Sequence, residues 1–164
     1  GFDVACHAIG DEAADLIVNI AAGLNGEGRP GTLHIEHGEI IRASTIEKMR
    51  GLPFEVHLQP SHWLTDQLWL KDKIGDLIEH AFPWRKLQEA DIPFDFGSDA
   101  PIEPASIARV FQAVRQSAEA GIPRLLGQPS SYMSHRDLSW VPNSYPVLEE
   151  EAPVQVVFRG EDIL

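Results

Sequence analysis

Four short apolar runs divide the first hundred residues of the chain. They are rich in Val, Ile, Leu and Phe, and Gly or Pro residues flank most of them, as is typical of buried strands. We therefore predict four β-strands, over residues 2–6, 32–37, 54–59 and 92–96.

A segment with helical spacing follows each predicted strand. Residues 12–24 repeat apolar side chains every three or four positions after a turn at Gly10 and Asp11, which we expect to provide the helix N-cap. Further helices are expected over 44–51, over 74–90 with an interruption at Pro83, and from Pro104 to near Gly121. Strand-then-helix units in series predict an α/β fold with a parallel sheet and right-handed crossovers.

The last quarter of the sequence loses this periodicity. Residues 122–153 are rich in Pro and Ser and end near an acidic run, and residues 154–158 predict a strand that no helix follows. We expect two regions, strand-helix units over 1–121 and an irregular connection with a terminal strand over 122–164.

Composition limits the class of protein. The chain has 164 residues, 43% of them apolar, which suits a single globular domain. Thirteen Lys and Arg against 25 Asp and Glu give a net charge of −12, which argues against nucleic acid and anionic membranes as partners. The apolar runs are too short to span a bilayer. The only cysteine, Cys6, excludes an internal disulfide and suits a reducing compartment, so we expect a cytoplasmic protein.

Three side chains that can bind metal ions follow strand-like runs. His37 lies 30 residues after His7, and Asp99 lies 62 residues after His37, which corresponds to one and then two strand-helix units of about 30 residues. Because the carboxyl ends of parallel strands share one edge, we expect these side chains to converge. Two imidazoles and a carboxylate suit a divalent metal that activates water, and Asp99 could move a proton from that water to a leaving amine. Taken alone, each residue would be interpreted as a surface histidine or a helix cap. The prediction of a metal site therefore depends on the recurrence of such residues at the same point of successive strand-helix units.

The other histidines carry less weight. His62, after the third strand, is a candidate to polarise a substrate carbonyl from the same rim. His34 and His57 lie within strands, and if His37 points inward, alternation places His34 on the opposite face as a packed or salt-bridged residue. His80 and His135 are expected on a helix surface and in a loop.

Four phrases in order resemble the amidohydrolase superfamily, and within it the branch that includes N-substituted formamide deformylases. They look like the phrases that follow that branch's fifth to eighth strands, within a likeness extending over residues 3–116; the phrases are residues 7–11, 35–37, 59–62 and 97–101. The resemblance implies the second half of a TIM-like (β/α)8 barrel that hydrolyses amide or related C–N bonds. It also implies His7 and His37 as metal ligands, Asp99 as ligand and proton shuttle, and one or two divalent ions, with zinc expected.

The sequence departs from that family in one important respect. The family's first-strand His-x-His pair and its fourth-strand Lys or Glu have no counterpart here. We therefore expect an incomplete metal site that binds zinc weakly and turns over a small amide-type substrate slowly, if at all. A half barrel also has open edges, so we expect self-association or pairing with the missing half.

Two other classes stay open. Two histidines and an aspartate also form the facial triad of non-haem iron oxygenases, although those folds are usually antiparallel. The chain could instead be a catalytically inactive interaction module that keeps the pocket residues as remnants. Iron-dependent oxygen uptake would support the first class, and a flat metal titration the second.

Overall fold

The computed structural model describes residues 3–28 and 31–123 of the chain. The predicted terminal strand at 154–158, His135 and nearly all of the expected irregular region lie outside the described residues, so the predicted division at residue 121 stays a prediction.

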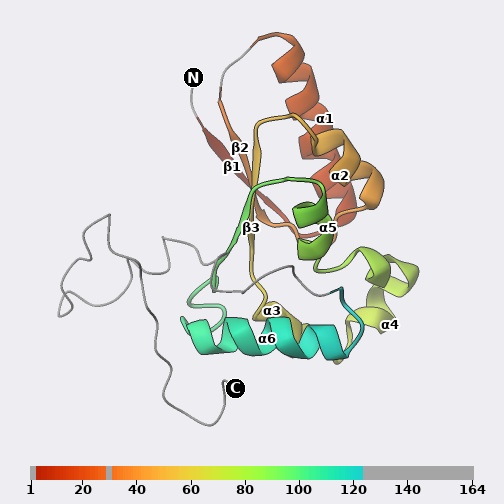
Figure 1. Cartoon of the computed structure of the whole chain (residues 1–164), viewed down its shortest axis with the longest axis vertical. Helices are drawn as coiled ribbons and strands as arrows, with labels where there is room; N and C mark the ends of the chain where they lie inside the picture. Colours follow the sequence, from red (N-terminus) through yellow and green to blue (C-terminus); the bar gives the residue numbers. More distant parts are fainter. Residues whose placement is uncertain (1–2, 29–30, 124–164) are drawn as a thin grey trace, which may run out of the picture.

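The described strands form one parallel sheet whose order follows the chain (Figure 1). They are β1 (Val4–Ala8), β2 (Leu33–His37), β3 (Phe54–Leu58) and β4 (Phe94–Phe96). Each strand therefore pairs with the next one along the chain, and the sheet forms a single arc. The parallel α/β fold predicted from the sequence is confirmed, and its four consecutive strand-helix units correspond to half of a (β/α)8 barrel.

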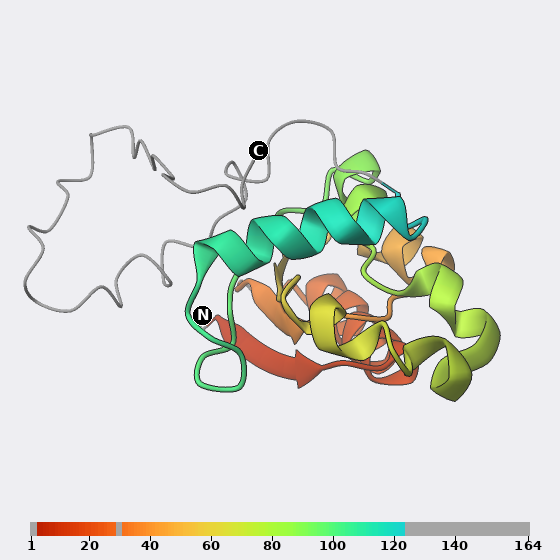
Figure 2. The same ribbon diagram turned by 90° about the horizontal axis from the view of Figure 1, so that it is seen from below.

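Helices cover one side of this arc. In Figure 1, α1 (Asp11–Gly26), α2 (Ala43–Met49) and α5 (Trp84–Glu89) lie on the same side of the strands. The chain between β3 and α5 forms α3 (His62–Asp66), α4 (Leu70–Ile74) and the 3-10 helix η1 (Gly75–His80). The last described helix, α6 (Ile107–Glu119), packs beside α3 (Figure 2).

Three details differ from the sequence predictions. Helices α3 and α4 were not expected, because five residues complete too few turns to give a readable apolar period. The segment before Pro83 is mainly 3-10 rather than α-helical, although a helix does restart after Pro83, at Trp84. Helix α1 begins at Asp11, and its N-cap position is Gly10, which offers no capping side chain.

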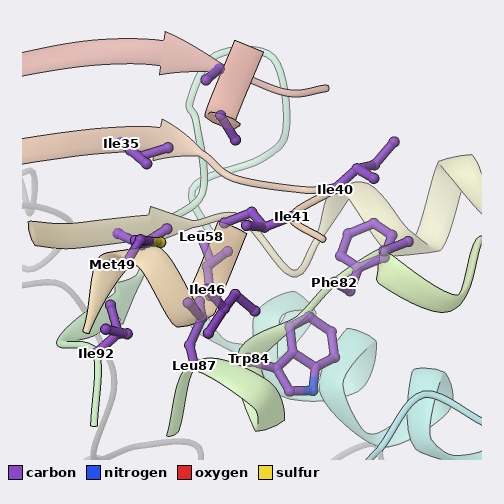
Figure 3. Close-up of a cluster of buried hydrophobic side chains, with 14 of the residues drawn as sticks. Ile35, Ile40, Ile41, Ile46, Met49, Leu58, Phe82, Trp84, Leu87 and Ile92 are labelled. Atoms are coloured by element: carbon purple, nitrogen blue, oxygen red, sulfur yellow. The ribbon is translucent and has the colours of Figure 1, made fainter. Parts of the chain in front are cut away.

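The hydrophobic core lies between the sheet and the helices. Figure 3 shows Ile46 and Met49 of α2 and Leu87 of α5 gathered near Ile35 and Leu58 of the strands. All five side chains are almost completely buried. The four strands are thereby fixed against their helices, and their carboxyl ends are presented together.

In the described part of the sheet β1 is an edge strand, and its outer edge is apolar on the helix side. Val4 is 48% exposed, and on the neighbouring helix Leu16 is 61% and Ile20 is 53% exposed. Next to them lies a cavity of about 240 Å³ that is bordered by Val4, Ile20 and Leu33 among others. This cavity is at the amino ends of the strands, the end opposite the predicted metal ligands. Within residues 3–28 and 31–123, none of the helices combines the length and the apolar character needed to cross a bilayer.

Candidate active site

Two of the predicted ligands lie side by side at the carboxyl ends of β1 and β2. The rings of His7 and His37 are 4.4 Å apart between centroids and meet edge to face at 72°. His7 is the penultimate residue of β1, and His37 is the last residue of β2. The convergence expected from the 30-residue spacing is therefore present for this pair.

The backbone at the end of β2 explains how His37 reaches His7. In the sheet, His37 is paired with Ala8, a buried residue on the helix side, so regular alternation would direct His37 away from His7. Instead His37 has a φ of 79° and the following Gly38 a φ of 55°. At Gly38 a Cβ would lie 2.8 Å from Val56 Cγ1, so glycine is needed there both for conformation and for space.

The segment after β2 is held by backbone hydrogen bonds from two directions. Gly38 N–H donates to the Ala8 carbonyl at 2.9 Å, and Ile40 N–H donates to the Ile9 carbonyl at 3.0 Å. From the other side, Phe82 N–H donates to the carbonyl of Glu39 at 2.6 Å. These bonds fix Glu39, which is buried, close to His37.

His62 lies between two carboxylates on the same rim. Its Nδ1 is hydrogen bonded to Glu39 Oε1, and its Nε2 lies 3.5 Å from Asp99 Oδ2. Its ring stacks against His37 with centroids 5.8 Å apart. His7, His37, His62 and Asp99 therefore form one continuous group of side chains, whereas sequence reasoning had overlooked Glu39, whose position after His37 carries no recognisable signal.

The two central histidines have opposite pKa shifts. Burial lowers the pKa of His37 and outweighs the nearby Asp99 carboxylate, so His37 is neutral near pH 7 and has a lone pair to offer. The hydrogen bond that His62 Nδ1–H donates to Glu39 is the main cause that raises the pKa of His62, which favours its protonated form. A protonated imidazole cannot bind a metal ion, but it can donate a hydrogen bond to a substrate oxygen.

Backbone strain coincides with this group. Among the described residues, the non-glycine positions with positive φ are His37, Phe82, Asp91 and Asp99. Two of these are predicted metal ligands, and Phe82 supplies the N–H that holds Glu39. Strained backbone of this kind is concentrated at functional sites, where it directs side chains that regular structure would direct elsewhere.

The residues present fit a divalent metal ion. His37 Nδ1 is buried and has no hydrogen-bond partner among the described residues, so this neutral nitrogen is available as a ligand. A second donor set, His37, Glu39 and His62, has atoms within 4.8 Å of one another. The predicted set of His7, His37 and Asp99 does not form a group this close among the described residues, whereas in the group that does, Glu39 already engages His62. The roles of these residues stay predictions.

The expectation for His34 was wrong about its face. His7 is paired with Glu36, Glu36 with His57, and His57 with Asp95, and paired residues point to the same side of a parallel sheet. His34 stacks on His57 and so shares the face of His7. The prediction assumed that His34 and His37 alternate regularly, whereas the positive φ of His37 breaks that alternation.

With this geometry established, the comparisons with known proteins identify the family. A sequence model of the amidohydrolase family matches residues 1–132. The chain belongs to the amidohydrolase family. YtcJ of Bacillus subtilis (strain 168), whose name assigns it to the amidohydrolases, is 37% identical over 106 residues, which cover 63% of this chain and 20% of YtcJ. Protein LONG AFTER FAR-RED 3 of Arabidopsis thaliana is 29% identical over 107 residues, covering 62% of this chain and 18% of that protein.

Solved structures of two metal-dependent hydrolases share the fold of this amidohydrolase chain. The one from Pyrococcus horikoshii OT3 superposes with a TM-score of 0.60 at 27% identity, covering 73% of this chain and 24% of its own. The one from Pyrococcus furiosus gives a TM-score of 0.54 at 27% identity, covering 84% of this chain and 26% of its own. The chain thus spans about a fifth of the length of the curated relatives and about a quarter of the solved chains.

Proposed function

We propose that this chain forms part of a metal-dependent hydrolase barrel and supplies His7, His37 and Asp99 as ligands of a divalent ion. The observation that carries the proposal is the buried Nδ1 of His37, which has no hydrogen-bond partner among the described residues, on a ring that lies against His7 at the rim. Zinc is the ion we expect, because imidazole and carboxylate ligands with an open position suit its hydrolytic chemistry.

The surrounding side chains suit hydrolysis of an amide-type C–N bond. A divalent ion held by His7, His37 and Asp99 would supply a water of lowered pKa. Asp99 then accepts the proton of the attacking water and delivers it to the leaving amine. The hydrogen bond to Glu39 raises the pKa of His62 and so favours the protonated ring, whose Nε2–H would donate toward the substrate carbonyl oxygen. Nε2 lies 3.5 Å from Asp99 Oδ2, so both groups can act at the same point of the rim.

The substrate class rests on resemblance. The phrases that contain His7, His37, His62 and Asp99 are similar to those of N-substituted formamide deformylases, so N-formyl and N-acyl amines are the substrates we propose to test. The metal-dependent hydrolases of matching fold support hydrolysis in general.

We further propose that the free edge of β1 pairs with other strands of a barrel, either from a second copy of the chain or from the missing half. The support is the exposed apolar group formed by Val4, Leu16 and Ile20 beside that edge. An unpaired strand next to an apolar surface is a template for association. Size-exclusion chromatography with light scattering should give a mass above that of one chain, and Leu16→Glu with Ile20→Lys should shift it to one chain. A monomer at high concentration would contradict pairing with a second copy and leave the missing half as the proposed partner.

The ligand assignment is tested by one matched pair of substitutions. Asp99 and Asp91 both have positive φ, at 57° and 56°, so asparagine fits the backbone at either position. Asp99→Asn should abolish the zinc-binding event at the rim and any hydrolysis of N-formyl amines, whereas Asp91→Asn should leave both unchanged. Zinc binding is measured by calorimetry and hydrolysis by release of the amine.

The outcomes also separate the active and inactive alternatives. Weak zinc binding that depends on Asp99, with slow hydrolysis, supports the proposal of an incomplete site. Tight stoichiometric zinc with rapid hydrolysis by the isolated chain would show that the site is complete. Zinc binding that is unchanged in Asp99→Asn would contradict the ligand assignment and leave the inactive interaction module as the better description.

A further inference from the structure

A second group of imidazoles and carboxylates lies on the same face of the sheet, further from the rim. It consists of His34 on β2, Glu55 and His57 on β3, and Asp95 on β4. His34 is paired with Glu55 across the sheet, and His57 with Asp95. Regular strand geometry therefore brings these four side chains together without any residue of the rim group.

Three of these side chains converge their donor atoms on one point. His34 Nδ1 and His57 Nε2 are 2.9 Å apart, and their rings are stacked with centroids 5.1 Å apart. Glu55 Oε2 lies 3.4 Å from His34 Nδ1. One donor atom from each residue lies within 4.8 Å of the other two, a spacing that a single ion can bridge.

The fourth residue orients one of the imidazoles. His57 Nδ1 is 2.7 Å from Asp95 Oδ1, so Nδ1–H donates to the carboxylate. In the neutral ring this places the lone pair on Nε2, which faces His34 and Glu55. A carboxylate that holds the remote nitrogen of a histidine ligand is the usual support of histidine–metal sites, and it increases the basicity of the ligand.

The charge around the group also favours a cation. Glu36, Glu55 and Asp95 face the same side as the two imidazoles and outnumber them. The side chain of His57 is 9% exposed and that of His34 is 15% exposed, so their nitrogens are largely withdrawn from water. A hydrogen shared between His34 Nδ1 and His57 Nε2 would satisfy these two atoms alone, whereas a cation would satisfy both nitrogens and Glu55 together.

We propose that His34, His57 and Glu55 bind a second divalent transition-metal cation, with Asp95 as the positioning residue for His57. Imidazole donors select ions such as zinc, cobalt and nickel over magnesium and calcium. The proposal shares no ligand with the rim site and does not rest on the proposed hydrolase function.

Cobalt(II) titration of the full 164-residue chain tests this site separately from the rim. In a His7→Gln/His37→Gln/Asp99→Asn background, which removes the predicted rim ligands and also breaks the donor set of His37, Glu39 and His62, visible absorption should still report about one cobalt per chain. In the same background His57→Gln should abolish this signal, and Asp95→Asn should weaken binding by about 10-fold to 100-fold. His80→Gln, the same substitution at a histidine outside both groups, should leave the titration unchanged.

Two results would overturn the proposal. One is the absence of a cobalt signal in the background variant while its circular dichroism matches that of the wild-type chain. The other is an unchanged affinity in Glu55→Gln, a substitution that keeps the shape of a 38% exposed side chain and so preserves the fold even if His57→Gln does not. A hydrogen-bonded histidine pair without a metal would then be the correct description.

Discussion

The two faces of the same sheet differ sharply, although their residues alternate along each strand. On β3 and β4, Val56 and Phe96 face the helices and are completely buried among apolar side chains. Their sequence neighbours His57 and Asp95 face the other side and form a hydrogen bond with each other. One residue of register therefore separates the side chains that hold the fold from those that carry polar chemistry.

This difference is informative because parallel strands are usually apolar on both faces. Strands covered by helices on one side and by a barrel interior on the other commonly appear as continuous apolar runs. Here His34, Glu36, Glu55, His57 and Asp95 occupy the second face. His57 is buried and the other four are partly buried, and withdrawing so many ionisable groups from water is costly unless they are paired or bind an ion, so this face indicates function rather than packing.

The largest expected effect comes from substituting two adjacent residues of β4, one on each face of the sheet, by alanine. Phe96→Ala removes a fully buried ring that contacts Trp84 and should lower the free energy of unfolding by about 3–5 kcal/mol. Asp95→Ala, one residue away on the other face, should cost less, about 1–3 kcal/mol, because it leaves His57 Nδ1–H without its carboxylate acceptor. Urea denaturation measures both, and equal losses would show that the two faces contribute alike to stability.

The next effect concerns the turn that brings His37 across to the polar face. Gly38→Ala adds a Cβ only 2.8 Å from Val56 Cγ1, so overpacking should cost about 1–3 kcal/mol in addition to the strain of positive φ. Gly51→Ala is the matched control, because Gly51 also has positive φ but its Cβ would meet nothing within 4 Å. If the two substitutions destabilise equally, backbone strain alone limits position 38.

The sequence predicted the strands and helices that form the two faces, but it missed the irregular backbone that turns His37 to the polar face. Apolar runs and helical spacing located the four strands and the larger helices, because both follow from repeating patterns. The proximity of the His7 and His37 rings was expected from the spacing of the two residues. The face predicted for His34 was wrong, because the positive φ of His37 has no sequence signature. Glu39 was missed because it joins the site through loop hydrogen bonds to Phe82, which is distant in sequence.

A smaller effect should distinguish the polar face by its dependence on pH. The hydrogen bond to Asp95 is the main cause that raises the pKa of His57, with Glu36 and Glu55 adding to it. Because the pKa is higher in the folded chain than in the unfolded chain, this stabilisation is complete below the unfolded pKa and is lost as pH rises through the folded pKa. In EDTA, Asp95→Asn should therefore destabilise the chain more at a pH of about 5 than at about 9.

The pKa of His37 is shifted in the opposite direction, downward. This shift is present in both the wild-type chain and Asp95→Asn, so it does not contribute to the difference between their free energies of unfolding. The pKa of His57 itself can be followed by NMR and should fall in Asp95→Asn. A destabilisation that is the same at both pH values would mean that Asp95 acts on His57 through shape alone.

The smallest effect is expected on the outer surface of the helices. Asp15 of α1 accepts hydrogen bonds from Lys48 Nζ at 2.7 Å and Thr45 Oγ1 at 2.9 Å, both on α2. The Lys48 bond is the main cause that lowers the pKa of Asp15, so this stabilisation is present above the unfolded pKa and is lost as pH falls through the folded pKa.

Asp15→Asn should therefore lower the free energy of unfolding slightly at neutral pH, and the difference from the wild-type chain should disappear in acid. High salt should reduce it as well, because exposed charges are screened. Glu12→Gln, the same loss of charge on the same helix, is the matched control for the effect at neutral pH. A difference that persists in acid would assign the contact between α1 and α2 to the hydrogen bond from Thr45 rather than to charge, and the helix layer would then be held without ionic contributions at this point.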